Sequence, residues 1–399
     1  KNITPSQKAI IASSIISESK TNHLFILDNL EDALYFLDDL NNTCFKNKAL
    51  LFPSCKRIEM GDNNIVLERI DVLKNLVEKR HNAIVTYPEA IQELIVEKTE
   101  FKKNQFKLKK NDLVNQDNLI IQLEKMGFES VDSVLEPGEF CAKGFILDIF
   151  SYGDEYPCRV LFDNETIEEI SYFKVSSQMS IKETVEFDIV ANIQSSKKDK
   201  VNATLFSYIP QNSIIWINNS SSLMSKEDNT ETSIDNENLN EIINKYTVIY
   251  SGYINNLKYS KTLEFKSQSQ PSFNRSFDLL IEHLSDYKLR GYQNFITTSS
   301  KSQINRLENI FQNHHDIVEL IELPNSLQSG FKDDLNKIIL YTDHQIFERH
   351  HQYKSKRVYQ TENTTSIKNL TDLKQGDYVT HFDYGVGMFD GLRIKKINN

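Results

Sequence analysis

Three short apolar segments constrain the fold of this chain more than any other feature. They are His23–Asp28, Lys48–Phe52 and Asn82–Tyr87, and amphipathic helical patterns separate them. Short and continuously apolar strands are typical of parallel sheets, because both faces of such sheets are covered. The alternation of strands with helices therefore predicts a doubly wound α/β layer at the start of the chain.

The pattern changes near Phe101. A lysine-rich stretch is followed by a single helix, Gln116 to Met126, and then by short strands and turns up to Val175. Strand and helix patterns resume from Glu186, as if the first layer were being completed. We interpret the middle of the chain as an α+β module inserted into the first α/β domain.

Two more regions follow. The patterns of residues 271–356 predict a second small α/β domain with helices at 277–289 and 303–313 and strands at 294–299, 316–323 and 336–343. Beyond a polar linker, residues 371–399 predict β-strands, with Gly385 and Gly387 at a tight turn. About thirty residues of β-structure cannot close a core alone. Since the chain also begins at Lys1 without a methionine, we interpret it as part of a longer protein.

Composition excludes several classes of function. A chain of 399 residues with 39% hydrophobic residues can build two to four cores. The net charge of −10 argues against a general coat for DNA or membranes, and no apolar run approaches the ~20 residues of a membrane span. The cysteines lack CxxC spacing and a nearby histidine, which favours reduced thiols in the cytoplasm; they are Cys44, Cys55, Cys141 and Cys158.

Motifs for catalysis and cofactor binding are missing from the sequence. None of the twelve glycines is followed by Lys-Ser or Lys-Thr, as the end of a phosphate-binding loop would require. No HExxH or GxSxG motif occurs. We expect no catalytic residue, no cofactor and no metal ion. The histidines at 314–315, 344 and 350–351 are interpreted as exposed residues beside helix ends.

A hairpin in the middle of the chain carries two cations that need an explanation. Ala142–Phe150 is predicted to be one strand and Pro157–Phe162 the returning strand. Lys143 would lie at the mouth of the first strand and Arg159 on the second. A buried aspartate such as Asp148 often indicates catalysis. Here it would lie opposite Arg159 and could pair with it across the strands.

The hairpin and its flanks carry a series of motifs in a fixed order. They are Pro137-Gly138-Glu139-Phe140, Lys143-Gly144, Leu147-Asp148-Ile149-Phe150, Gly153-x-Glu155-x-Pro157, Arg159, Glu165-x-Ile167 and Phe173. These motifs resemble the second domain of the bacterial transcription-repair coupling factors (Mfd) and, more distantly, the excision-repair protein UvrB. Residues 51–76 resemble the degenerate P-loop-like domain of that family, and residues 376–392 resemble the start of its RNA-polymerase-interacting, CarD-like domain.

The resemblance implies the architecture. It implies a degenerate P-loop-like α/β domain with an inserted α+β module like UvrB domain 2, a second small α/β domain, and the start of an SH3/Tudor-like β-barrel. The expected boundaries are 1–104 for the first part of the P-loop-like domain, 105–191 for the UvrA-binding module, 192–265 for the completion of the first domain, 271–356 for the small α/β domain, 357–370 for a linker and 371–399 for the incomplete polymerase-interacting domain.

The resemblance also implies a function. It implies a non-catalytic adaptor that mimics UvrB and recruits UvrA to RNA polymerase stalled at DNA damage. The UvrA contacts would be Lys143, Arg159 and Phe162. The RNA polymerase β subunit would bind through the domain only begun here, at residues that stay unknown. DNA would bind the missing motor domains of an ATP-dependent translocase.

Two departures from the family pattern and four alternatives remain open. Lys143 stands where arginine is common and so lacks a bidentate fork, and Asp163 stands where an aromatic residue is expected. Arg159 could serve only Asp148, and Phe162 could be a core residue. The lysine-rich stretch 98–110, with Phe101 and Phe106, could bind nucleic acid. A residual nucleotide site is the fourth alternative.

Overall fold

The structure is a computed structural model. It describes residues 3–43, 48–55, 63–78, 83–192, 201–219, 236–251, 260–349 without 272, 274, 315 and 324, and the short pieces 376, 378–381 and 385–388. Cys44, His315, His350, His351 and the expected linker 357–370 lie outside these residues.

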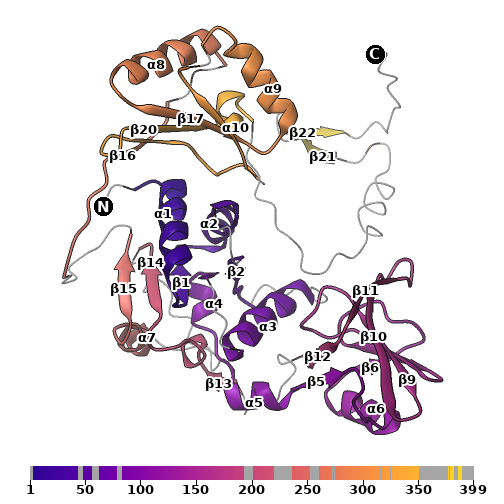
Figure 1. The fold of residues 1–399 in the computed structure, drawn as a ribbon. Coiled ribbons are helices and arrows are strands. Elements are labelled where there is room, and N and C mark those ends of the chain that lie inside the picture. The colour runs from indigo at the N-terminus through magenta and orange to yellow at the C-terminus, as the bar shows by residue number, and fades with distance from the viewer. Residues whose placement is uncertain are drawn as a thin grey trace, which may run out of the picture.

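The first layer is a five-stranded parallel sheet in the order β15-β14-β1-β3-β2 (Figure 1). All residues of β1 and β3 are buried, which is why their sequences are continuously apolar. The three strands predicted at the start of the chain are confirmed. The strands are β1 (His23–Ile26), β2 (Leu50–Leu51), β3 (Ala83–Thr86), β14 (Ile214–Ile217) and β15 (Thr247–Tyr250).

Helices α1 (Pro5–Glu18), α2 (Leu30–Thr43) and α3 (Asn63–Val77) pack on this sheet, and the shorter α4 (Pro88–Ile91) and α7 (Asn236–Ile243) complete the layer. Pro5 begins α1 because a proline needs no hydrogen-bond acceptor in the first helical turn. The side chain of Asn29 accepts a hydrogen bond from the backbone of Asp32 at 2.9 Å and so starts α2.

A narrow junction connects the first layer to the inserted module. Helix α5 (Lys98–Lys103) leads into β5 (Gln105–Lys109), which pairs antiparallel with β12 (Glu186–Val190). Next to it, β4 (Ile95–Val96) pairs with β13 (Val201–Ala203), which the short helix η3 (Leu205–Ser207) follows. The prediction that the first layer resumes at Glu186 was wrong, because β12 joins β5 instead; the parallel sheet resumes only at β14.

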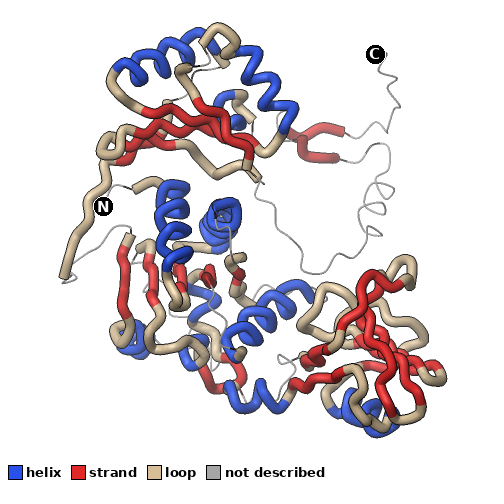
Figure 2. The backbone as a smooth tube through the Cα atoms, in the orientation of Figure 1, coloured by secondary structure: helices blue, strands red, loops and turns tan. Residues whose placement is uncertain are grey.

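The inserted module is a six-stranded sheet with one helix, α6 (Gln116–Lys125) (Figure 2). The expected α+β character is confirmed, but Ala142–Phe150 is two strands and not one. β7 ends at Lys143, and β8 begins at Ile146. Gly144 adopts a φ of 60° at the turn, which glycine tolerates best. The strand order is β11 (Ser180–Thr184), β10 (Thr166–Phe173), β9 (Cys158–Asp163), β8 (Ile146–Ile149), β7 (Glu139–Lys143) and β6 (Glu129–Ser130).

The third unit is a second small α/β domain with a core of its own. Its mixed sheet has the order β16 (Ser267–Ser269), β19 (Phe331–Asp333), β20 (Ile338–Thr342), β17 (Gln293–Thr298) and β18 (Glu319–Glu322). Helices α8 (Phe277–Leu289) and α9 (Lys301–Ile310) lie on the side of the sheet that faces away from α1 and α2 (Figure 1). The predicted helices and strands are confirmed, whereas β16, β19 and the short α10 (Asp343–Ile346) were not predicted.

At the end of the chain, β21 (Tyr378–His381) pairs antiparallel with β22 (Gly385–Met388). Gly385 and Gly387 lie in β22, so their predicted place at a tight turn was wrong; the connection is residues 382–384, outside the described part. Most of the expected SH3/Tudor-like barrel also lies outside the described residues. No helix within the described residues has the length and apolar character that crossing a membrane would need.

Candidate interaction surface

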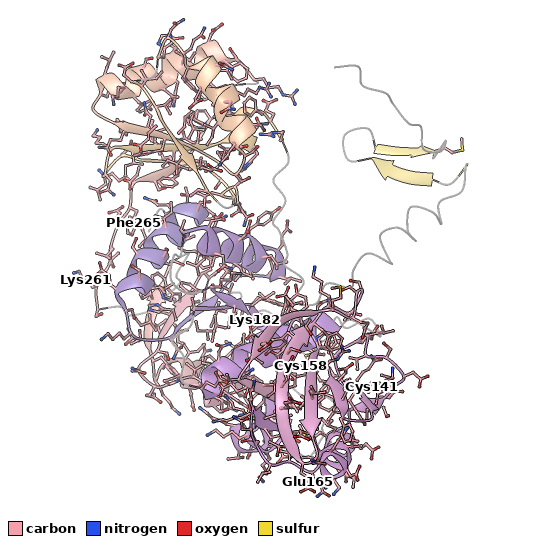
Figure 3. The ribbon with its side chains drawn as sticks, turned by 45° about the vertical axis from the view of Figure 1, so that its right-hand side comes forward. Cys141, Cys158, Glu165, Lys182, Lys261 and Phe265 are labelled. Atoms are coloured by element: carbon pink, nitrogen blue, oxygen red, sulfur yellow. The ribbon has the colours of Figure 1, made fainter. Side chains whose placement is uncertain are left out.

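The six-stranded sheet has two faces of different character. Cross-strand partners share a face, and the register pairs Lys143 with Ile146, Ile146 with Leu161, and Asp148 with Arg159. Together with Cys141 and Phe173, these residues form what we call the outer face. The inner face carries Leu147, Val160 and Cys158, all fully buried in the core (Figure 3 labels Cys141 and Cys158). Burial raises the pKa of the Cys158 thiol, so it is an unreactive core residue.

Arg159 and Asp148 form a bidentate ion pair on the outer face. The Nε atom of Arg159 donates to Oδ1 of Asp148 at 2.7 Å, and Nη2 donates to Oδ2 at 2.8 Å. The guanidinium also lies 4.7 Å from the ring centre of Phe173. Hydrogen bonding to Asp148 raises the pKa of Arg159. The predicted cross-strand pair is confirmed, and Arg159 accounts for the presence of a buried carboxylate at Asp148.

Lys143 lies in a different environment from Arg159. It is the last residue of β7 and is exposed at the turn to β8. Within residues 83–192, no hydrogen bond or ion pair holds its ammonium group. The cation is therefore free to meet an anionic group outside the module.

Phe162 was predicted to contact UvrA, with a place in the core as the alternative, and the structure supports the alternative. Phe162 pairs with Ile167 on the inner face and is only 3% exposed, so its side chain belongs to the core and does not reach the surface. Phe145, at the turn after Lys143, is 63% exposed. Sequence reasoning missed it because the segment was taken as one strand. Gly144, directly before it, was the available signal.

The lysine-rich stretch forms the junction and lacks the proposed stacking platform. Phe101 is completely buried and meets the ring of Tyr208 edge-on, and Phe106 is half-buried. Lys107 is held by Glu186 at 2.9 Å and by Asp188 at 3.4 Å. Base stacking needs exposed rings, so this arrangement does not support nucleic-acid binding there.

The carboxyl end of the parallel sheet is where such folds usually bind ligands. Here side chains fill it: Lys8 donates to Asn218 at 2.8 Å, and Asn218 donates to Asp28 at 2.7 Å. Burial lowers the pKa of Lys8 to about 8. The sequence at this point, Leu27-Asp28-Asn29, has no glycine to bring the backbone close to a phosphate. The local structure therefore offers no support for a residual nucleotide site.

One predicted exposed histidine is buried. His344 is 9% exposed, and its ring contacts Ser326, Thr342 and the carbonyl of Gln328. The interpretation as a histidine exposed beside a helix end was wrong here, because the loop before β19 covers it. Among the described residues, no group of three or more His, Cys, Asp or Glu side chains is placed to hold a metal ion.

Comparison with known proteins agrees with the geometry. Residues 106–194 match the model of the UvrB interaction domain, and this range covers β5, the six-stranded module and β12. A transcription-repair-coupling factor of Borreliella burgdorferi is 25% identical over 394 residues, covering 84% of this chain and 34% of that protein. Those of Bacillus subtilis and Staphylococcus haemolyticus are 20% identical, covering 99% and 100% of this chain and 42% of each protein.

The chain is similar to transcription-repair-coupling factors. The resemblance inferred from the hairpin motifs is thereby confirmed. The chain spans between 34% and 42% of the length of these relatives.

Proposed function

We propose that this chain is the adaptor region of a transcription-repair-coupling factor, which imitates UvrB in order to recruit UvrA to RNA polymerase stalled at DNA damage. One observation carries the proposal. The range that matches the UvrB interaction domain coincides with the module whose outer face ends in an exposed cation, Lys143.

The tip of the β7–β8 turn supplies the chemistry for binding. Lys143 offers a positive charge, and the neighbouring Phe145 offers an exposed ring. Ile146 and Leu161 lie behind them and are half-buried. Charges at an interface set the association rate and specificity, and a few aromatic or apolar anchors dominate the affinity. The complementary surface on UvrA would be acidic with an apolar centre.

The other parts of the proposal concern partners beyond this module. RNA polymerase would bind with its β subunit to the domain that begins near residue 371. DNA binding and ATP-driven translocation would belong to motor domains outside this chain. The region itself would act in the cytoplasm without a cofactor, and its first layer would be a P-loop-like fold that has lost its nucleotide site.

The proposal is tested by calorimetric titration of UvrA with this chain and its Lys143→Ala variant. We expect Lys143→Ala to weaken binding about 5- to 150-fold, as removal of an interface anchor typically costs about 1–3 kcal/mol. Lys125→Ala is the matched control, because Lys125 is an exposed lysine on α6 of the same module. Equal affinities for the two variants would move the interface away from the turn. Absence of binding by the unchanged chain would refute the adaptor function.

A second variant tests whether Arg159 contributes directly. Arg159→Met alone would leave Asp148 in a buried position without its cation and could unfold the module. The double variant Asp148→Asn/Arg159→Met removes both charges and avoids this problem. If the double variant folds and still binds UvrA like the unchanged chain, Arg159 serves the structure alone.

A further inference from the structure

A short loop of the third unit makes several of its hydrogen bonds to the first layer. The loop, residues 325–330, lies directly before β19 and faces α1 and α2; we call it the docking loop. Three of its backbone N–H groups donate to side-chain oxygens of the two helices. The bonds run from Asn325 to Oδ1 of Asn42 at 3.0 Å, from Gln328 to Oδ1 of Asp39 at 2.7 Å, and from Ser329 to Oγ of Ser6 at 3.1 Å.

Asp39 is the centre of this contact. It is completely buried, and its second oxygen accepts a hydrogen bond from the hydroxyl of Ser6 at 2.6 Å. Burial raises the pKa of the Asp39 carboxyl to about 7, and the neighbouring Asp38 adds to this effect. Asp39 thus holds two elements at once: one oxygen binds the docking loop and the other binds α1. Its loss would remove the acceptor of the Gln328 amide and also the acceptor that orients the Ser6 hydroxyl, to which Ser329 donates.

Much of the contact is polar. Ile10 of α1 packs against the small apolar cluster of Leu327, Phe331 and Leu340. At the polar positions, Nε2 of Gln7 donates to Oδ2 of Asp333 at 2.6 Å. Polar groups regain hydrogen bonds from water when two domains separate, whereas apolar surface does not. Separation is therefore much less costly here than it would be across an apolar interface. The buried polar residues of α1 and α2 that face this side are Ser6, Gln7, Asp38, Asp39 and Asn42.

The third unit has its own core, which does not depend on this contact. Leu284, Ile296, Leu307 and Ile339 are completely buried in a cluster separate from that of the first layer. We propose that the third unit is a detachable domain that Asp39 latches onto α1 and α2 through the docking loop. The latch recognises backbone N–H groups, so it depends on the shape of the loop more than on its side chains.

Residue-level amide hydrogen exchange tests this latch. In an Asp39→Ala variant we expect the amides of residues 325, 328 and 329 to exchange about tenfold faster or more, because loss of a buried hydrogen bond costs on the order of 1–3 kcal/mol. The amide of Gly330 is an internal control. It donates to Oε1 of Gln345 within the third unit and should keep its protection.

Small-angle X-ray scattering completes the test, with Glu31→Ala as the matched control, since Glu31 is an exposed acid on the same helix. The radius of gyration should increase for Asp39→Ala and stay unchanged for Glu31→Ala. Three outcomes would overturn the proposal: unchanged exchange at residues 325, 328 and 329; loss of protection at Gly330 together with them, which would show that the third unit unfolds on release; or faster exchange with an unchanged radius of gyration.

Discussion

Two arginines of this chain make the same kinds of contact in two different settings. Arg69 on α3 donates to Glu93 at 2.7 Å, and Arg159 on β9 donates to Asp148 at 2.7 Å. Each guanidinium also lies over a phenylalanine ring, at 4.3 Å and 4.7 Å. The first pair belongs to the first layer, where it joins α3 to the segment after α4, and the second belongs to the inserted module.

The settings differ in their access to solvent. The side chains of Arg69 and Glu93 are 5% and 9% exposed, and Arg69 also donates to the carbonyl of Pro53 at 2.7 Å. The side chain of Arg159 is 28% exposed. We call the pair of Arg69 and Glu93 sealed and the pair of Arg159 and Asp148 half-open. The sealed pair can only stabilise the fold. The half-open pair also holds part of the Arg159 guanidinium at the surface of the module. The same chemistry thus serves the architecture in one region and can serve recognition in the other.

The largest expected effect is at the sealed pair. Arg69→Met should lower the free energy of unfolding by about 3–5 kcal/mol, because Glu93 would lose its buried cation. Urea denaturation followed by circular dichroism measures this. Adding Glu93→Gln should restore part of the loss. A cost below about 1 kcal/mol for Arg69→Met would show that the sealed pair is no more important than a surface pair.

Among the described residues, Asp39 is a buried acid without a cationic partner, in contrast to Glu93 and Asp148. Its hydrogen bonds come from a hydroxyl and a backbone amide and not from an arginine. Its pKa is raised from 3.8 to about 7, so the folded state favours the protonated form. Its contribution to stability is complete below about pH 4. Relative to Asp39→Asn, stability should then fall by roughly 1.4 kcal/mol for each pH unit up to about pH 7. Urea denaturation of both proteins between pH 4.5 and 8 is the measurement, and a constant difference would contradict this assignment.

The half-open pair should cost less to break. Arg159→Met should lower the free energy of unfolding by about 1–3 kcal/mol. The side chain of Asp148 is only 12% exposed, but the site of the guanidinium is 28% exposed, so water can approach the carboxylate once the cation is removed. Adding Asp148→Asn should recover most of this loss, and a thermodynamic cycle over the four proteins measures the coupling. A cost equal to that of Arg69→Met would remove the distinction between the two settings.

Local apolar patterns in the sequence were enough to predict much of the fold. The strands of the first layer were predictable because burial on both faces makes them continuously apolar. The pairing of β12 with β5 was not, because Glu186–Val190 looks like another parallel strand and its partner lies some eighty positions earlier in the chain. Long-range pairing is set by the packing of the whole chain, which a local pattern does not contain.

On the outer face of the inserted module, local patterns likewise predicted some residues correctly and missed others. The pair of Asp148 and Arg159 was predictable, because opposite charges in facing strands meet across a hairpin. The aromatic residue was not predicted correctly. The turn at Gly144 and Phe145 interrupts an apolar run without breaking its pattern, so the exposed Phe145 was missed and the buried Phe162 was chosen. The burial of His344 depends on the docking loop, whose position no nearby residue indicates.

The smallest expected effect on stability is at Lys143, although its effect on binding should be large. Lys143→Ala should change the free energy of unfolding by less than about 0.5 kcal/mol, because the side chain is exposed and makes no ion pair within residues 83–192. Thermal denaturation beside Lys125→Ala checks this, and a clear loss of stability would mean that Lys143 supports the turn. A stable variant with weakened UvrA binding would show that Lys143 serves only the surface, in contrast to the sealed Arg69, which serves only the fold. The double variant Asp148→Asn/Arg159→Met decides whether Arg159 serves both.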